Sequence, residues 1–235
     1  MARGFFALGA LLALSCGPAP LASDESELAR ARLLMVKEQV EARGVKDPLV
    51  LGAMRTVPRH DFVPPAALAE AYGDHPVPIG HGQTVSQPYI VAFMTDSLGL
   101  KGGEKVLEVG TGSGYQAAVL AQAASAVYSI EIVGPLAEEA RERMARLGYR
   151  NVFVRAGDGY KGWPEAAPFD AVIVTAAAPK VPEPLKQQLK DGGRLVIPVG
   201  DQSQELVVLT RRGDPFEERR VLAVTFVPMT GEVRK

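Results

Sequence analysis

The sequence predicts an α/β fold: a doubly wound, mostly parallel sheet with an antiparallel C-terminal edge and an N-terminal helical addition. Three observations predict it. From residue 105 onward, short apolar segments alternate with helical ones, which is the pattern of a parallel sheet covered on both faces. Two β-rich runs follow one another near the end of the chain and imply an antiparallel edge. A glycine-rich turn follows the first strand, where sheets of this kind bind their ligands.

The segment before the sheet is predicted to be mainly helical. Apolar side chains from Leu28 to Val40, Leu33 among them, recur at helical spacing, and Gly44 follows as a stop signal. The Asp47-Pro48 pair supplies an N-cap and a first-turn proline for a second helix. Residues 76–87 are rich in Gly and Pro and predict a structured loop. We therefore expect helices over residues 26–43, 47–54 and 88–98.

The alternating part of the chain gives the elements of the sheet in order. Its strands are short and apolar, and the strand at residues 169–175 is apolar enough to be central. The predicted strands are residues 105–109, 127–130, 152–155, 169–175, 194–199, 205–210 and 220–228, and the helices are residues 115–123, 135–147 and 183–189. We expect three parts: a signal-like segment at 1–23, helices with a substrate loop at 24–100, and the ligand-binding core at 101–235.

Composition excludes several function classes. The chain has 235 residues, 47% of them hydrophobic, and a net charge of -1. This charge gives no field that would favour nucleic acid, so we expect no nucleic-acid partner. The only cysteine is Cys16, and the three histidines lack ligand spacing. We therefore expect neither an intrachain disulfide nor a metal site, because a zinc site needs about three or four protein donors.

The first residues have the pattern of a secretory signal. Arg3 precedes the apolar run from Phe5 to Leu14, and small residues around Cys16 follow. The run is too short to span a membrane well. We expect export, either to the periplasm or to a membrane through acylated Cys16, and membrane contact only in that second case. The alternative is a cytoplasmic protein whose start codon lies further along the chain.

The strongest local motif is the turn that begins at Glu108. Gly110, Gly112 and Gly114 follow it at alternate positions, which lets a ligand approach the backbone closely. A dinucleotide site has the spacing G-x-G-x-x-G, and here Tyr115 occupies the place of its last glycine. A carboxylate beside the turn repels a pyrophosphate but suits a cationic ligand, so the pattern favours S-adenosylmethionine. A nicotinamide-linked oxidoreductase and an ordinary tight turn remain alternatives.

Two further strand ends support the same ligand. Glu131 ends the second strand, where a carboxylate accepts hydrogen bonds from vicinal ribose hydroxyls. Asp158 ends the third strand and could accept from the adenine amine, although a lone aspartate there is also a common helix cap. The predicted cofactor-binding residues are Glu108, Val109, Gly110, Thr111, Gly112, Ser113, Gly114, Glu131, Asp158 and Gly159.

The end of the fourth strand limits the methyl acceptor. Methyltransferases that act on exocyclic amines usually carry an Asn/Asp-Pro-Pro-aromatic turn there. In this chain Val174 is followed by Thr-Ala-Ala-Ala-Pro, which lacks the amide or carboxylate. Amine methylation of that type is therefore disfavoured.

Beyond these patterns, the sequence resembles the protein-L-isoaspartate O-methyltransferase family. The resemblance covers roughly Leu28 to Gly231, and the segment from Gln83 to Pro88, Gln-Thr-Val-Ser-Gln-Pro, is its most specific part. It implies the class I S-adenosylmethionine-dependent, Rossmann-like fold. The departure is the signal-like N-terminus, since members are usually cytosolic. The matching stretches are Pro78–Tyr89, Glu108–Tyr115, Gly157–Gly159, Pro168–Pro179, Gly192–Gly200 and Phe226–Met229.

The resemblance implies a chemistry and a set of residues. The reaction is methyl esterification of the α-carboxylate of isoaspartyl residues, so isoaspartyl proteins and peptides are the expected partners, and we expect a monomer. By position, Ser86 is the active-site hydroxyl, and the expected substrate-binding residues are Thr84, Gly80, Gly82, Val227 and Thr230. The acceptor is already ionised at neutral pH, so no general base is required. From position alone, Ser86 is also a candidate helix cap.

Three alternative functions stay open at this point. The first is a methyltransferase of the same fold that acts on a small-molecule carboxylate or hydroxyl. The second is the nicotinamide-linked oxidoreductase already named. The third is a lipid-anchored binding protein with a vestigial site, and the presence of Glu108, Glu131, Asp158 and Ser86 argues against it.

Overall fold

The computed structural model describes Met1 and residues 25–234, so the predicted signal-like segment lies outside the described residues apart from Met1. A seven-stranded sheet forms the centre of the described chain, with the strand order β5-β4-β3-β6-β7-β8-β9. The first five strands of this order are parallel, β8 pairs antiparallel with β7, and β9 pairs antiparallel with β8. This strand order confirms the predicted doubly wound sheet with an antiparallel edge. The strands are β3 (Lys105–Val109), β4 (Ala126–Glu131), β5 (Val152–Ala156), β6 (Phe169–Val174), β7 (Leu189–Val199), β8 (Gln204–Arg211) and β9 (Phe216–Val224).

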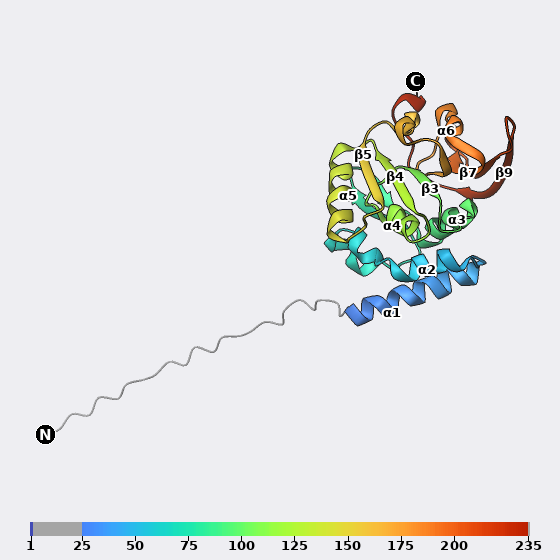
Figure 1. The fold of residues 1–235 in the computed structure, drawn as a ribbon. Helices are drawn as coiled ribbons and strands as arrows, with labels where there is room; N and C mark the ends of the chain where they lie inside the picture. The colour runs from blue at the N-terminus through green and yellow to red at the C-terminus, as the bar shows by residue number, and fades with distance from the viewer. Residues whose placement is uncertain (2–24, 235) are drawn as a thin grey trace.

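Helices cover both faces of the sheet (Figure 1). On one face, α3 (Pro88–Leu98) and α4 (Tyr115–Ala121) bury apolar side chains against Val106 and Ile173. On the other face, α6 (Glu183–Gln187) packs with Leu107 and Val172. The side chains of β3 and β6 therefore alternate between two cores, as a sheet buried on both faces requires. The remaining long helix, α5 (Gly134–Arg146), packs along β5.

The N-terminal helices form an additional layer at one end of the core, where α1 and α2 lie side by side (Figure 1). The predicted helix over residues 26–43 is continuous in path but changes type, with α1 (Glu25–Met35) followed by a π-helical stretch (Val36–Val40) and a 3-10 turn (Glu41–Arg43). Asp47 caps α2 (Pro48–Thr56) as predicted, accepting hydrogen bonds from two backbone N–H groups of its first turn. Leu33, assigned to the apolar face, is 51% exposed instead.

Three predicted boundaries were wrong for identifiable reasons. Within the predicted loop 76–87, residues Val77–Gly80 (β1) and Gln83–Val85 (β2) pair as an antiparallel hairpin. Leu189 does not end the last helix but begins β7, because it pairs with Phe169 across an irregular register. The last strand is shifted to Phe216–Val224, because its pairing with β8 begins at the Arg211 turn and ends at Gln204. Short 3-10 helices at Arg59–Phe62, Pro65–Glu70, Gly159–Lys161, Pro164–Ala166 and Glu232–Arg234 complete the described elements.

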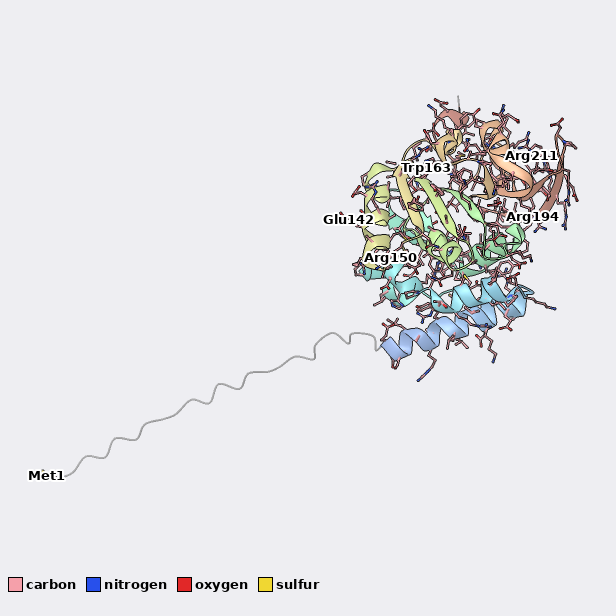
Figure 2. All side chains as sticks on the ribbon, viewed as in Figure 1. Met1, Glu142, Arg150, Trp163, Arg194 and Arg211 are labelled. Carbon is pink, nitrogen blue, oxygen red and sulfur yellow. The ribbon has the colours of Figure 1, made fainter. Side chains whose placement is uncertain are left out.

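The two ends of the sheet differ in character. At the end where the parallel strands begin, Arg194 reaches from β7 to the last turn of α3 and donates to the Ser97 carbonyl at 3.3 Å (Figure 2). At the other end, the chain reverses its winding direction at β3, which lies between β4 and β6. In open α/β sheets this switch point leaves a crevice for a ligand.

Candidate functional site

A cleft opens at the carboxyl ends of β3, β4 and β6. Counted out to its open mouth, the cleft holds about 630 Å³. Its walls come from the turn after β3, the end of β4, the β6 end at Thr175, the hairpin residues Gln83 and Thr84, and the C-terminal segment 227–230. The cleft therefore lies at the switch point where the sequence placed it.

The turn after β3 is held by both neighbouring strands. The Gly110 N–H donates to the Ile130 carbonyl at 2.8 Å, and the Thr175 hydroxyl donates to the Gly110 carbonyl at 2.6 Å. Gly110 has φ +98°, and a Cβ there would lie 2.3 Å from the Thr175 hydroxyl oxygen. Only glycine satisfies both the conformation and this close approach.

Glu131 connects the turn to the floor of the cleft. Its side chain is 5% exposed, and it lines the cleft. One carboxylate oxygen accepts from Gly112 N at 2.8 Å and the other from Val133 N at 3.0 Å. Because a carboxylate has about four acceptor positions, two protein hydrogen bonds leave capacity for two ligand hydroxyls. Glu131 thus both fixes the glycine turn and offers the acceptors predicted for a ribose.

Glu108 lies behind the turn rather than in the cleft. It is fully buried, and Ser129 donates a short hydrogen bond to one of its carboxylate oxygens. The other oxygen has no hydrogen-bond partner among residues 25–234. Ser129 also shares a hydrogen bond with Thr111 in the turn. Burial raises the pKa of Glu108 to about 8, and the nearby carboxylate of Glu131 raises it further against the opposing Ser129 hydrogen bond.

This arrangement revises the sequence-based picture of Glu108. The residue was expected to offer a negative charge directly beside a cationic ligand. In the structure it reaches the turn only through Ser129 and Thr111, and a carboxyl group with a pKa near 8 is mostly protonated at pH 7. Glu108 is therefore a neutral acid at this pH, and it supports the turn from behind through its hydrogen bond to Ser129.

Asp158 acts as a helix cap, which is the alternative role that its position at a strand end also predicts. Its carboxylate accepts from Tyr160 N at 3.0 Å and so caps the 3-10 helix that begins at Gly159. Its second oxygen accepts from Glu232 N at 2.8 Å. Asp158 thereby fastens the C-terminal segment to the end of β5, and an adenine contact stays a prediction.

An inner extension of the cleft leads to Ser86. It is lined by the turn residues Thr111 and Ser113 and by Thr84, Ser86 and Thr175. The cap position of α3 belongs to Gln87, whose side chain makes no capping hydrogen bond. The Ser86 hydroxyl makes no hydrogen bond to any residue that the structure describes, so the helix-cap alternative for Ser86 is not realised.

The hairpin β1-β2 covers the glycine turn. Its tip has three successive left-handed residues, Gly80, His81 and Gly82, with φ of +87°, +52° and +69°. The Ile79 side chain lies 3.4 Å from the position that a Cβ on Gly112 would take. Gly80 and Gly82 therefore shape the loop that places Thr84 and Ser86, as expected, without lining the cleft themselves.

An open groove adjoins the cleft on the other side of Ser86. It spans about 1480 Å³ with its open mouth included, and it runs between the start of α3 and the extended residues 222–227. The groove and the cleft share Thr84, Thr175 and Val227, so they are two parts of one hollow. Ser86 lies where the groove meets the inner extension of the cleft.

The predicted site residues divide into those that line the hollow and those that support it. Val109, Gly110, Gly112, Glu131, Gly159, Thr84, Val227 and Thr230 line the cleft, and Thr111, Ser113 and Ser86 line its inner extension. Glu108, Gly114, Asp158, Gly80 and Gly82 line neither. Gly114 begins α4 with φ +90°, and a Cβ there would lie 2.4 Å from the Met144 methyl group.

Of the lining residues that the sequence did not predict, two have distinct features. Ile132 is 43% exposed although it is large and apolar, and it forms part of the cleft wall next to Glu131. Its position directly after the acidic strand end was the available signal. Thr175 touches all three parts of the hollow and holds Gly110. Its role depends on the alignment of β6 with β3, which local sequence does not reveal.

Two general properties of the described chain bear on function. Within residues 25–234, no three His, Cys, Asp or Glu side chains gather in a way that could hold a metal ion. In the same part of the chain, no helix combines the length and apolar character that crossing a membrane needs.

Comparison with protein families identifies close relatives. Residues 30–234 match the family model for protein-L-isoaspartate(D-aspartate) O-methyltransferase. A relative from Shewanella sediminis, protein-L-isoaspartate O-methyltransferase 2, is 54% identical over 90% of this chain and 88% of its own length. A protein-L-isoaspartate O-methyltransferase from Opitutus terrae is 56% identical over 84% of this chain and 86% of its own length.

Solved structures agree with these relatives. A protein-L-isoaspartate O-methyltransferase superposes with a TM-score of 0.78 at 29% identity, over 87% of this chain and 67% of its own. A structure from Plasmodium falciparum, assigned as a beta-aspartate methyltransferase and solved with S-adenosyl-L-homocysteine, has a TM-score of 0.74 at 28% identity. It covers 85% of this chain and 98% of its own.

The burial of Glu108 predicts an unusual dependence of stability on pH. Between its ordinary pKa of 4.5 and the folded value of about 8, the folded protein keeps a proton that the unfolded chain has released. The free energy of unfolding should therefore fall as pH rises through this window, by at most about 1.4 kcal/mol per unit, and level off above it. Glu108→Gln should remove this contribution.

Urea unfolding of the ligand-free protein at pH 5, 6.5 and 8 measures the effect. The free energy of unfolding of Glu108→Gln should increase relative to that of the native sequence as pH rises. Glu142→Gln, on the exposed outer side of α5 (Figure 2), is the control and should give a pH-independent difference. A pH-independent difference for Glu108→Gln as well would show that Glu108 ionises normally in the fold.

Proposed function

Because this chain belongs to the protein-L-isoaspartate(D-aspartate) O-methyltransferase family, we propose that the cleft binds its methyl donor and the groove its damaged protein substrate. The chain is an S-adenosylmethionine-dependent repair methyltransferase. It esterifies the α-carboxylate of L-isoaspartyl residues, and the ester then cyclises without the enzyme to a succinimide. Membership of the family disfavours the oxidoreductase alternative and the vestigial binding protein.

One observation carries the assignment of the two subsites. The inner extension of the cleft meets the open groove at Ser86, and the cleft and the groove share Thr84, Thr175 and Val227. A transferase needs two compartments that meet at one point, because donor and acceptor must be aligned before transfer. Both compartments are built from a single chain, which supports a monomer as the working form.

The residues of the cleft fit S-adenosylmethionine. Glu131 offers carboxylate acceptors for ribose hydroxyls, and the glycine turn, which lacks side chains at Gly110 and Gly112, allows close approach of the amino-acid end. Gly159 lines the cleft and lets the backbone pack closely on Val109, because a Cβ there would lie 2.2 Å from a Val109 methyl group. Ile132 supplies an apolar wall. When bound, S-adenosylmethionine supplies an electrophilic methyl group on a positively charged sulfur.

Ser86 suits the orientation of an acceptor carboxylate. Its hydroxyl is free of other hydrogen bonds within the described chain, and its neighbours in the inner extension, Thr84 and Thr175, are uncharged. An ionised carboxylate needs no base. A neutral hydroxyl donates one hydrogen bond and leaves the charge on the oxygen, whereas a cation at this point would stabilise the nucleophile and slow it. We assign Ser86 this role, with Thr84 beside it.

The roles of the other predicted substrate-binding residues follow from where they lie in the structure. Gly80 and Gly82 set the hairpin that presents Thr84 and Ser86, and Val227 and Thr230 belong to the segment that walls the cleft. Val227 also borders the groove. We therefore assign Val227 and Thr230 contacts with the donor or the acceptor.

The proposed substrate is tested by a pair of isomeric peptides. The purified protein should transfer labelled methyl from S-adenosylmethionine to an isoaspartyl peptide and leave the aspartyl peptide of the same sequence at background. Base-labile label, lost as methanol, would identify the ester. Equal labelling of both isomers, or labelling of small carboxylates in preference to either peptide, would favour the small-molecule alternative.

Ser86→Ala tests the role of the hydroxyl. Loss of one orienting hydrogen bond should reduce turnover by at least about tenfold, which corresponds to about 1.4 kcal/mol. Binding of S-adenosyl-L-homocysteine, measured by calorimetry, should be unchanged. Ser97→Ala, on the helix that follows Ser86, is the control, since the Ser97 hydroxyl donates to the Phe93 carbonyl and does not line the hollow. Full turnover in Ser86→Ala would remove Ser86 from the reaction.

We propose further that the protein is exported. The support is the order of Arg3, the apolar run Phe5–Leu14 and Cys16, which fits a cleaved signal or a lipoprotein signal. Acylation of Cys16 would add membrane attachment. Export would require an external supply of S-adenosylmethionine, which cells make internally.

Mass spectrometry of the N-terminus of the native protein tests export. A mature chain that begins within residues 16–25 supports it, and a diacylglyceryl mass on Cys16 supports lipid attachment. A chain that retains Met1 or begins with an internal methionine would establish the cytoplasmic alternative.

A further inference from the structure

The groove beside Ser86 contains one charged side chain. Among the described residues that line it, Arg43 alone carries a charge. The other walls are apolar or neutral, with Tyr89 and Ile90 from α3 on one side and Leu222 and Phe226 on the other. A single cation in an otherwise uncharged groove has no competing charge on the walls, so it dominates the local electrostatic preference.

Arg43 is positioned by stacking rather than by a tight ion pair. Its guanidinium carbon lies 3.6 Å from the centre of the Tyr89 ring. Its contact with Asp74 is long, at 3.4 Å, and both side chains are more than 40% exposed. Asp74 does not line the groove, and its other carboxylate oxygen accepts from Gln87 at 2.8 Å. Most of the guanidinium N–H groups therefore remain available to a ligand.

The backbone around Arg43 determines which part of the groove its guanidinium can contact. Arg43 is the last residue of a 3-10 turn that Gly44 ends with φ +97°. Tyr89, under the guanidinium, follows Ser86 by three positions at the start of α3. Because Arg43 and Ser86 line the same groove, a peptide whose acceptor lies at Ser86 would carry flanking residues past the guanidinium.

We propose that Arg43 is a specificity-determining residue that selects isoaspartyl sites flanked by an aspartate or glutamate. The inference rests on the proposed function of the groove and adds a preference among its substrates. Arg43 binds the flanking carboxylate by a charge-assisted hydrogen bond and disfavours lysine or arginine at the same place. It does not bind the reacting carboxylate, which lies at Ser86.

The expected size follows from the exposure of the site. Partly exposed charge pairs are worth up to about 1 kcal/mol, so an acidic flank should be favoured over a basic one by about 3- to 10-fold in kcat/KM. The preference should shrink at high salt, because exposed charges are screened over about 10 Å at 0.1 M salt. The difference should appear mainly in KM, since the flanking residue takes no part in the chemical step.

The test uses three isoaspartyl peptides that differ only in flanking residues: neutral, glutamate-bearing and lysine-bearing. For each protein variant, kcat/KM is divided by its value on the neutral peptide. Peptide affinity is measured separately by fluorescence anisotropy with S-adenosyl-L-homocysteine present. The native sequence should favour the glutamate peptide in both measurements, Arg43→Gln should abolish the preference, and Arg43→Glu should reverse it.

Three further variants separate specificity from structure. Arg43→Lys keeps the cation and should retain most of the preference. Asp74→Asn removes the competing carboxylate and should increase it. Arg55→Gln is the matched control: Arg55 pairs with Glu41 at 3.0 Å, with side-chain exposures of 43% and 48% close to those of Arg43 and Asp74, but it does not line the groove. It should leave the preference unchanged.

The outcomes are distinguishable. If no isoaspartyl peptide is methylated by the native protein, the proposed function fails and this inference fails with it. If all three peptides are methylated equally well, the function stands and the inference fails. If Arg43→Gln lowers kcat/KM on the neutral peptide as much as on the glutamate peptide, Arg43 acts on the reacting carboxylate or on the fold, and the inference is overturned.

Discussion

The turn after β3 is the constraint on which the whole site depends. Its first glycine is bonded to the end of β4 through the Ile130 carbonyl and to the end of β6 through the Thr175 hydroxyl. Glu131 holds its second glycine. Residues of two neighbouring strands can bond to the turn only because β3 lies between β4 and β6 in the sheet. A change in strand order or register would thus remove the cleft itself, not merely one of its residues.

The two buried carboxyl groups near this turn differ in environment and therefore in role. Glu131 lines the cleft and accepts hydrogen bonds from two backbone N–H groups, which are suitable donors to a carboxylate. Glu108 has only a serine hydroxyl, no cation and no solvent, so burial raises its pKa to about 8. At neutral pH the region consequently carries less negative charge than its sequence suggests. Charge complementarity to a cationic ligand comes from the residue in the cleft, while the buried one supports the backbone.

Much of the fold could be predicted from sequence because its signals are local. The alternation of apolar strands and helices and the glycine spacing located every strand of the large sheet, with errors mainly at the ends. The hairpin at residues 77–85 was missed because its turn places His81, a non-glycine residue, in a left-handed conformation between two glycines. β7 runs through Gly192 and Gly193, which normally predict a break, because Leu189 before them pairs with Phe169 and Arg194 after them pairs with Ala171 of β6 across an irregular register.

The candidate site was less predictable, for a physical reason. Motif spacing identifies which side chains follow which strand, but not which way they face. Asp158 is predicted to contact a ligand, and the structure shows in addition that it holds the C-terminal segment through Glu232 N, a partner 74 positions away. Glu108 is predicted beside the ligand, and the structure places it behind the turn, bonded to Ser129. Both features depend on long-range contacts that no local pattern encodes.

The distribution of charge around the hollow matches the demands of a reaction between a carboxylate and a cationic methyl donor. Opposite charges attract before transfer and disappear during it, so strong fields at the reacting atoms stabilise the reactants more than the transition state. The lining near the acceptor position is accordingly neutral, with Ser86, Thr84 and Thr175. The charged groups lie farther from that position: Glu131 lines the cleft, where we propose that the donor binds, and Arg43 lines the groove. They can attract each reactant to its compartment without holding the atoms that must react, which leaves alignment as the main contribution of the protein to the rate.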